Sequence, residues 1–100
     1  MTNQRSLPQS LTDFLKALGN TKRQEILLNI FGDEQEHNIT EVSARAEIAQ
    51  STASEHLSLL KRAGILESRK MEKEVFYHLD RKEIIAKIDE IKNMLSCCLE

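Results

Sequence analysis

Proline, glycine and cysteine are all scarce in this chain of 100 residues, which has one Pro, three Gly and two Cys. No long linker or low-complexity tract interrupts it, so we expect a single domain with a folded core over about residues 10–98 and a flexible segment at 1–9. The two cysteines, Cys97 and Cys98, are adjacent. This placement excludes the disulfide framework of a small secreted domain.

Long apolar runs are absent as well, and none approaches the ~20 residues that a membrane helix needs. The first ten residues contain no apolar signal segment, so we expect a cytoplasmic protein with no membrane partner. A glycine-rich phosphate loop, a Ser/His/Asp arrangement and paired carboxylates are missing, which argues against an enzyme. The net charge of −2 and the pI of 5.9 argue mildly against a nucleic-acid binder.

Apolar spacing predicts a mainly α fold with a small β-hairpin. The acidic segment 32–38 is expected to form a loop with an exposed His37, and a charged turn is expected at 71–74. The expected helices lie at about 10–18, 21–31, 40–46, 50–63 and 81–99, and the expected strands near 66–70 and 75–79.

Several of these helices have recognisable capping residues. Asn20 or Thr21 can cap the second helix, and Thr40 can cap the third. Asp80 is a favourable N-cap for the last helix. Gly64 is expected at the C-cap of the fourth helix, where it releases the chain into the hairpin.

The fourth expected helix has two unlike faces. A rotation of 100° per residue from Ala53 places Leu57 and Leu60 on the inner side. The opposite side carries small hydroxyls, one acid and one base, and such side chains allow a close approach to phosphates and base edges. The DNA-binding residues expected on this helix are Ser51, Thr52, Ser54, Glu55, His56, Ser58 and Arg62.

Two of these residues have alternative roles. Glu55 can accept from a cytosine amine, or it can pair with Arg62 two turns away if both side chains bend. His56 lies on the flank of the helix and is either structural or adjacent to a phosphate.

The order of a short helix, a tight turn, a longer helix and a hairpin is typical of a winged helix-turn-helix. Its hairpin contacts the DNA backbone beside the groove, so we expect Arg69, Lys70 and Lys73 to meet phosphates. Residues 50–81 contain six bases and five acids, whereas the acids Asp33, Glu34 and Glu36 gather elsewhere. The predicted binding face is therefore less acidic than the chain as a whole.

Three segments together resemble the ArsR/SmtB family of bacterial winged-helix repressors: "NTKRQEILLNIF", "ITEVSARAEIAQSTASEHLSLLKRAGIL" and "EVFYHLD". The shared motifs are the K-R…I-L of the second helix, the S-x-x-S-x-H-L from Ser51 to Leu57, and L-x-x-A-G-(I/L)-(L/V) from Leu60 to Leu66. The resemblance covers about residues 10–98. It implies a dimeric repressor that a small signal, commonly a metal ion or a thiol oxidant, releases from operator DNA. The hairpins of such proteins commonly carry a Gly in the turn, where this chain has Glu72, so the turn at 71–74 is expected to be longer or looser.

The sensor sites of that family are incomplete here. Ser43 stands where the helix before the recognition helix usually has a cysteine. The positions that match the zinc ligands of the last helix hold Arg81, Glu83, Met94 and Cys97. The remaining candidate is Cys97 with Cys98, either as a redox pair or as a site for a thiophilic metal or metalloid ion, the one cofactor considered. The structural alternative makes Cys98 a small buried apolar residue.

The last expected helix has an apolar seam with the spacing 4, 3, 4, 3, which suits a two-fold contact. The homodimer interface expected from this seam and the first helix comprises Leu11, Phe14, Leu15, Ile84, Ile88, Ile91, Leu95 and Cys98. Two alternatives stay open. One is a regulator without metal sensing, and the other is a winged helix that serves as a protein-interaction or dimerisation module, for which no steep salt dependence of DNA binding is expected.

Overall fold

The computed structural model describes residues 6–98, except for the side chains of Cys97 and Cys98. The expected flexibility of 1–9 falls largely outside this range and stays a prediction. Within it, the helices and hairpin follow in the predicted order, and a short strand is added. The elements are α1 (Gln9–Leu18), α2 (Thr21–Asn29), the 3₁₀ helix η1 (Phe31–Asp33), β1 (His37–Asn38), α3 (Ile39–Ala46), α4 (Gln50–Arg62), β2 (Leu66–Met71), β3 (Glu74–Leu79) and α5 (Arg81–Cys98).

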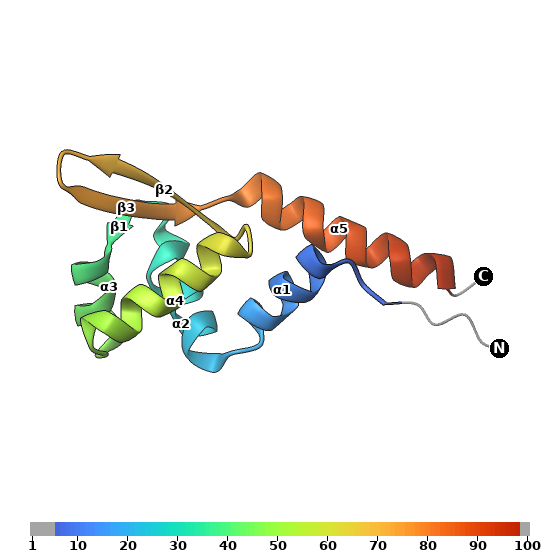
Figure 1. Ribbon diagram of the computed structural model, residues 1–100, viewed down its shortest axis with the longest axis horizontal. Helices are drawn as coiled ribbons and strands as arrows, with labels where there is room; N and C mark the ends of the chain where they lie inside the picture. The colour runs from blue at the N-terminus through green and yellow to red at the C-terminus, as the bar shows by residue number, and fades with distance from the viewer. Residues whose placement is uncertain (1–5, 99–100) are drawn as a thin grey trace.

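The sheet is antiparallel in the order β1-β3-β2. α2, α3 and α4 lie on one side of it, while α1 and α5 run out from the end opposite the hairpin turn (Figure 1). The central strand β3 pairs Tyr77 with His37 on one side and with Ser68 on the other. Tyr77 is buried, so its neighbours Phe76 and His78 lie on the outer face of the sheet. In the described range, no helix has the length and apolarity to cross a membrane.

The second helix is shorter than the sequence predicts. α2 ends at Asn29, and Ile30 and Phe31, both expected in the helix, leave it. Ile30 has φ −107°, and the chain then tightens into η1, which turns the fully buried Phe31 ring into the core. Core packing of this ring therefore overrides the apolar spacing that predicted a longer helix.

Side-chain caps fix the helix starts. Asn20 Oδ1 accepts from the backbone N–H of Arg23 at 3.0 Å, so Asn20 rather than Thr21 caps α2. Asn38, and not Thr40 as predicted, caps α3 by accepting from the N–H of Glu41 at 2.9 Å. The predicted cap at Asp80 is confirmed by its acceptance from the N–H of Glu83 at 3.1 Å.

The prediction of an exposed His37 in a loop is wrong. His37 opens β1, is 4% exposed, and packs edge-to-face on Phe31 with 5.3 Å between ring centroids. Its Nδ1 lies 3.0 Å from a Glu41 oxygen and its Nε2 lies 2.9 Å from Asp33. Carboxylates only accept, so this geometry favours the imidazolium form of His37, in which both ring nitrogens carry protons. This ion cluster ties η1 and α3 to β1.

The hairpin turn is tight, contrary to the prediction of a long or loose one. Met71 pairs with Glu74, which leaves Glu72 and Lys73 as a two-residue turn. Glu72 has φ 58°, the left-handed conformation that usually falls to Gly. A tight turn thus forms without glycine and places Lys73 at the tip of the hairpin.

Gly64 lies one residue beyond the C-cap of α4, which is Ala63. The N–H of Gly64 donates to Lys61 O and the N–H of Ile65 donates to Leu60 O, both at 3.0 Å, which is the Schellman pattern. Gly64 has φ +80°, and a Cβ there would lie 3.2 Å from side-chain carbons of Glu83 and Lys87. Glycine is therefore the residue that fits where α4 passes into β2.

We predict that Gly64→Ala lowers the free energy of unfolding by about 1–2 kcal/mol, because Ala disfavours this backbone conformation. Urea unfolding followed by circular dichroism measures the change. Gly32→Ala is the matched control, since its Cβ would meet only Leu27 O at 3.9 Å. Equal stability of the two variants would contradict the assigned role of Gly64.

We also predict that the free energy of unfolding falls as the pH rises from about 6 through the folded-state pKa of His37. Burial on its own lowers the pKa of His37, but the hydrogen bonds to Asp33 and Glu41 outweigh it and raise the pKa above 6.5. The stabilisation is complete below the unfolded-state pKa and is lost as the pH rises through the folded-state pKa. It amounts to about 1.4 kcal/mol for each pH unit that separates these two pKa values. Urea unfolding across this range should show a smaller decline for His37→Gln, and an identical decline would refute the assignment.

Candidate nucleic-acid interface

α4 is held by its inner face. Ala53, Leu57 and Leu60 are each 0% exposed and belong to the core, as the sequence predicts. Removing a leucine side chain such as that of Leu57 or Leu60 from water stabilises a fold by roughly 1.5–3 kcal/mol. The rotation of the helix about its axis is therefore fixed by packing, and so is the set of residues that it presents outward.

The turn before α4 is braced by Ser43, the residue that replaces the usual cysteine of the resembled family. Its hydroxyl donates to Ile48 O at 2.6 Å, and the N–H of Ile48 donates back to Ser43 O at 3.1 Å. Glu47 takes the left-handed conformation, φ 56°, that reverses the chain between α3 and α4. Ser43 thus acts on the geometry of the turn.

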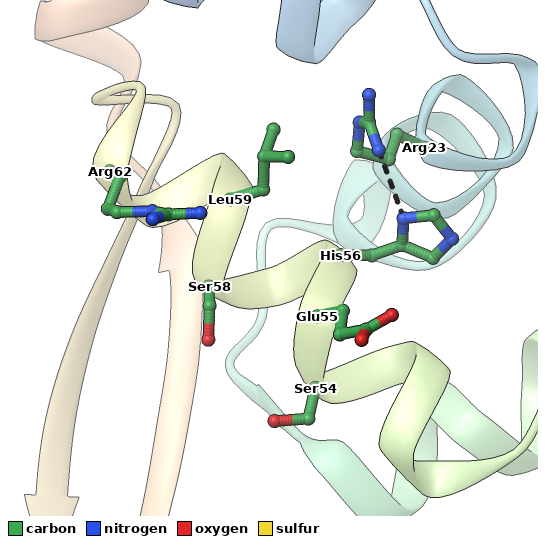
Figure 2. A pocket seen from close by; sticks show the side chains of 7 residues that line it. All are labelled: Arg23, Ser54, Glu55, His56, Ser58, Leu59 and Arg62. Carbon is green, nitrogen blue, oxygen red and sulfur yellow. Dashed lines mark hydrogen bonds between the residues drawn. The ribbon is translucent and has the colours of Figure 1, made fainter.

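The outer face of α4 carries the residues that the sequence singled out. Ser51, Glu55 and Ser58 are exposed, and so is Arg62 near the end of the helix. Figure 2 shows Ser54, Glu55, Ser58 and Arg62 projecting from successive turns of α4. An open depression of about 600 Å³ runs along this helix. Its lining residues are Arg23, Ser54, Glu55, His56, Ser58, Leu59 and Arg62.

Arg23 fastens α4 to the first two helices. Its Nε donates to Ala17 O at 2.8 Å and its Nη2 to Lys16 O at 3.2 Å, which satisfies carbonyls at the end of α1. Its Nη1 donates to Nδ1 of His56 at 3.2 Å (Figure 2). Burial, and then the charge of Arg23, lower the pKa of His56, which favours the neutral acceptor form. His56 thus has a structural partner in Arg23, and its expected contact with DNA stays a prediction.

Arg23 is the part of this surface that sequence reasoning missed. It lies 33 positions before His56, so no helical spacing joins the two residues. The available signal was its place next to Lys22 in the K-R motif of the second helix. That motif indicated a resemblance without revealing a contact.

The three basic residues of the hairpin differ in their surroundings. Arg69 forms a two-pronged ion pair with Glu36, with Nη2 2.7 Å from Oε1, and this hydrogen bond lowers the pKa of Glu36. Lys70 and Lys73 are exposed and have no ion pair within the described residues. The lysines are therefore accessible to phosphates, whereas Arg69 already has an anionic partner.

The expected dimer residues divide into two groups. Leu11 and Phe14 are 0% and 1% exposed, so they belong to the core of the protomer rather than to an exposed interface. Ile84 and Ile91 are partly buried against the same core, because α5 packs on its own domain along that line. Among the described side chains of α1 and α5, the large apolar ones that are exposed are Leu15, Ile85, Ile88 and Leu95. Ile85, which lies off the predicted seam, is an addition.

The predicted sensor falls outside the described part of the structure. Cys97 and Cys98 are in the last turn of α5, but their side chains are not among those described. Among the side chains that are described, no three His, Cys, Asp or Glu residues gather as metal ligands. The thiol site therefore stays a prediction.

Comparison with known proteins shows the family to which this chain belongs. Residues 20–68 match the family described as "Bacterial regulatory protein, arsR family". The transcriptional activator HlyU of Vibrio cholerae serotype O1 is 39% identical over 83 residues, which are 83% of this chain and 74% of that protein. The chain belongs to the ArsR family. It is accordingly a DNA-binding transcriptional regulator and not an enzyme, as the sequence predicts.

Solved structures of ArsR-type proteins share the fold. HlyU from Vibrio cholerae N16961 superposes with a TM-score of 0.65 at 34% identity, covering 86% of this chain and 91% of that one. A homodimeric winged helix-turn-helix DNA-binding domain from Mycobacterium bovis gives 0.69 at 21% identity, over 100% of this chain and 94% of that one. The predicted winged helix-turn-helix is thereby confirmed.

Proposed function

We propose that this ArsR-family protein is a homodimeric repressor that binds operator DNA with α4 in the major groove and the β2–β3 hairpin beside the backbone. The observation that carries the proposal is the pair of opposite faces on α4. Its inner face is completely buried, and its outer face carries the exposed hydroxyls of Ser51 and Ser58, the acid Glu55, and Arg62 in the last turn. Short hydroxyl side chains let a helix approach base edges and phosphates closely.

The charge distribution supports binding in spite of the net charge of −2. Arg62, Lys70 and Lys73 are exposed, and none of them has an ion pair within the described residues. Each contact to a phosphate releases condensed counterions, so affinity should fall steeply as salt is raised. A protein-interaction module would lack this salt dependence.

Exposed apolar side chains support the dimer. Leu15 on α1 and Ile85, Ile88 and Leu95 on α5 are between 42% and 65% exposed. α1 and α5 lie at the end of the domain opposite the hairpin turn (Figure 1). A two-fold contact between two such surfaces would remove them from water. It would also present two α4 helices to successive major grooves, about 34 Å apart.

The direction of regulation has a second candidate. A bound dimer that covers a promoter blocks transcription, which is the repressor proposed here. The relative HlyU is named an activator, and this favours activation as the alternative. A reporter gene under the chain's own upstream DNA distinguishes them: loss of the protein should raise expression if it represses, and lower expression if it activates.

We predict that Arg62→Ala weakens binding to operator DNA about tenfold and reduces the slope of log affinity against log salt by about 1. Fluorescence anisotropy at several salt concentrations measures both. Lys92→Ala, which removes an exposed cation from α5, is the control and should leave the affinity unchanged. If Arg62→Ala bound DNA as tightly as the wild type, the placement of α4 against DNA would be contradicted.

Cys97 and Cys98 are proposed as the sensor, since they end the helix that carries the exposed apolar residues. A soft metal ion, a metalloid or an oxidant acting there would alter the dimer and release DNA. We predict that the double variant Cys97→Ser, Cys98→Ser still binds DNA but no longer responds. Shift assays across thiophilic metals, arsenite and oxidants test this, and a response equal to that of the wild type would exclude the cysteines.

A further inference from the structure

The recognition face of α4 carries one acid. Glu55 is exposed and is the sixth of the thirteen residues of the helix. It projects from the outer side, away from the core (Figure 2). In a helix-turn-helix, the N-terminal part of the recognition helix contacts base edges. Glu55 is therefore in the part of α4 that reads sequence.

Glu55 has no cation to neutralise it within the protein. Among the described residues, its carboxylate forms no ion pair within 4.0 Å. Arg62 lies on nearly the same line of the helix, but seven residues at 1.5 Å each separate the two by about 10 Å. The nearby His56 is held by Arg23 and is favoured in its neutral form. Glu55 and Arg62 therefore form no ion pair in this structure.

An unpaired carboxylate facing a duplex is unfavourable unless it meets a donor. The phosphates repel it, and most groups on the floor of the major groove are acceptors. The two donors there are the cytosine N4 amine and the adenine N6 amine. Adenine N7, an acceptor beside N6, repels a second acceptor, whereas cytosine has no acceptor next to N4 at the groove edge.

We propose that Glu55 is a specificity-determining residue that accepts a hydrogen bond from the N4 amine of a cytosine in each operator half-site. The inference rests on the proposed function and deepens it. The neighbouring Ser51, Ser54 and Ser58 are small enough to let the helix approach within reach of the base. Glu55 thereby lowers the affinity for all DNA, since the phosphates of every sequence repel its charge. In return it increases the difference in affinity between sites with and without the cytosine.

The test is selection from a pool of randomised duplexes with the wild type, Glu55→Gln and Glu90→Gln. Glu90 is an exposed acid on α5, so its variant matches the change in charge without touching α4. The wild type and Glu90→Gln should enrich a cytosine at one position of each half-site. Glu55→Gln should lose it in favour of adenine, because an amide both accepts from N6 and donates to N7.

Affinities for single duplexes then measure the effect. Replacing the selected cytosine by thymine should weaken wild-type binding about tenfold and Glu55→Gln binding by less than about twofold. Glu55→Gln should also bind random DNA a few-fold more tightly than the wild type. Retention of the same cytosine by Glu55→Gln would overturn the inference. If the wild type enriches no sequence, the proposed function fails and the inference falls with it.

Discussion

The packing of one side of α4 is the interaction on which the rest of the structure depends. Because Ala53, Leu57 and Leu60 are completely buried, the helix cannot rotate without exposing them to water. The serines, Glu55 and Arg62 are thereby directed away from the core. Two further devices fix the ends of the helix: the Ser43–Ile48 hydrogen bonds at the turn before it, and the Schellman turn with Gly64 after it.

Polar contacts connect this helix to the other elements. Arg23 joins the end of α1 to His56 on α4, and the imidazolium of His37 joins η1, β1 and α3. Both side chains donate hydrogen bonds to acceptors on different elements. Hydrogen bonds are directional, so they fix the relative positions of these elements more closely than apolar contacts do. α1 and α5 also carry the exposed apolar residues, so Arg23 links the proposed dimer surface to the recognition helix.

The sequence was informative where local rules dominate. The period of α4, the cap at Asp80 and the hairpin could all be predicted, since each depends on neighbours within a few positions. Two local predictions, the cap at Thr40 and a loose hairpin turn, were wrong. The other differences have a non-local cause. Strand β1, the burial of His37 and the ion pair of Arg69 with Glu36 depend on contacts between distant residues. Leu11 and Phe14 have the same apolar spacing whether they face the core or a partner, so spacing alone could not distinguish the two.

The central claim is that the outer face of α4 is the surface that meets DNA. Amide chemical shifts recorded by NMR while an operator duplex is added test it most directly, because they report on every element at once. The account predicts the largest changes along residues 51–62 and at the hairpin turn around Lys73, and small changes on the exposed faces of α2 and α5. Changes confined to α5, with α4 unaffected, would contradict it.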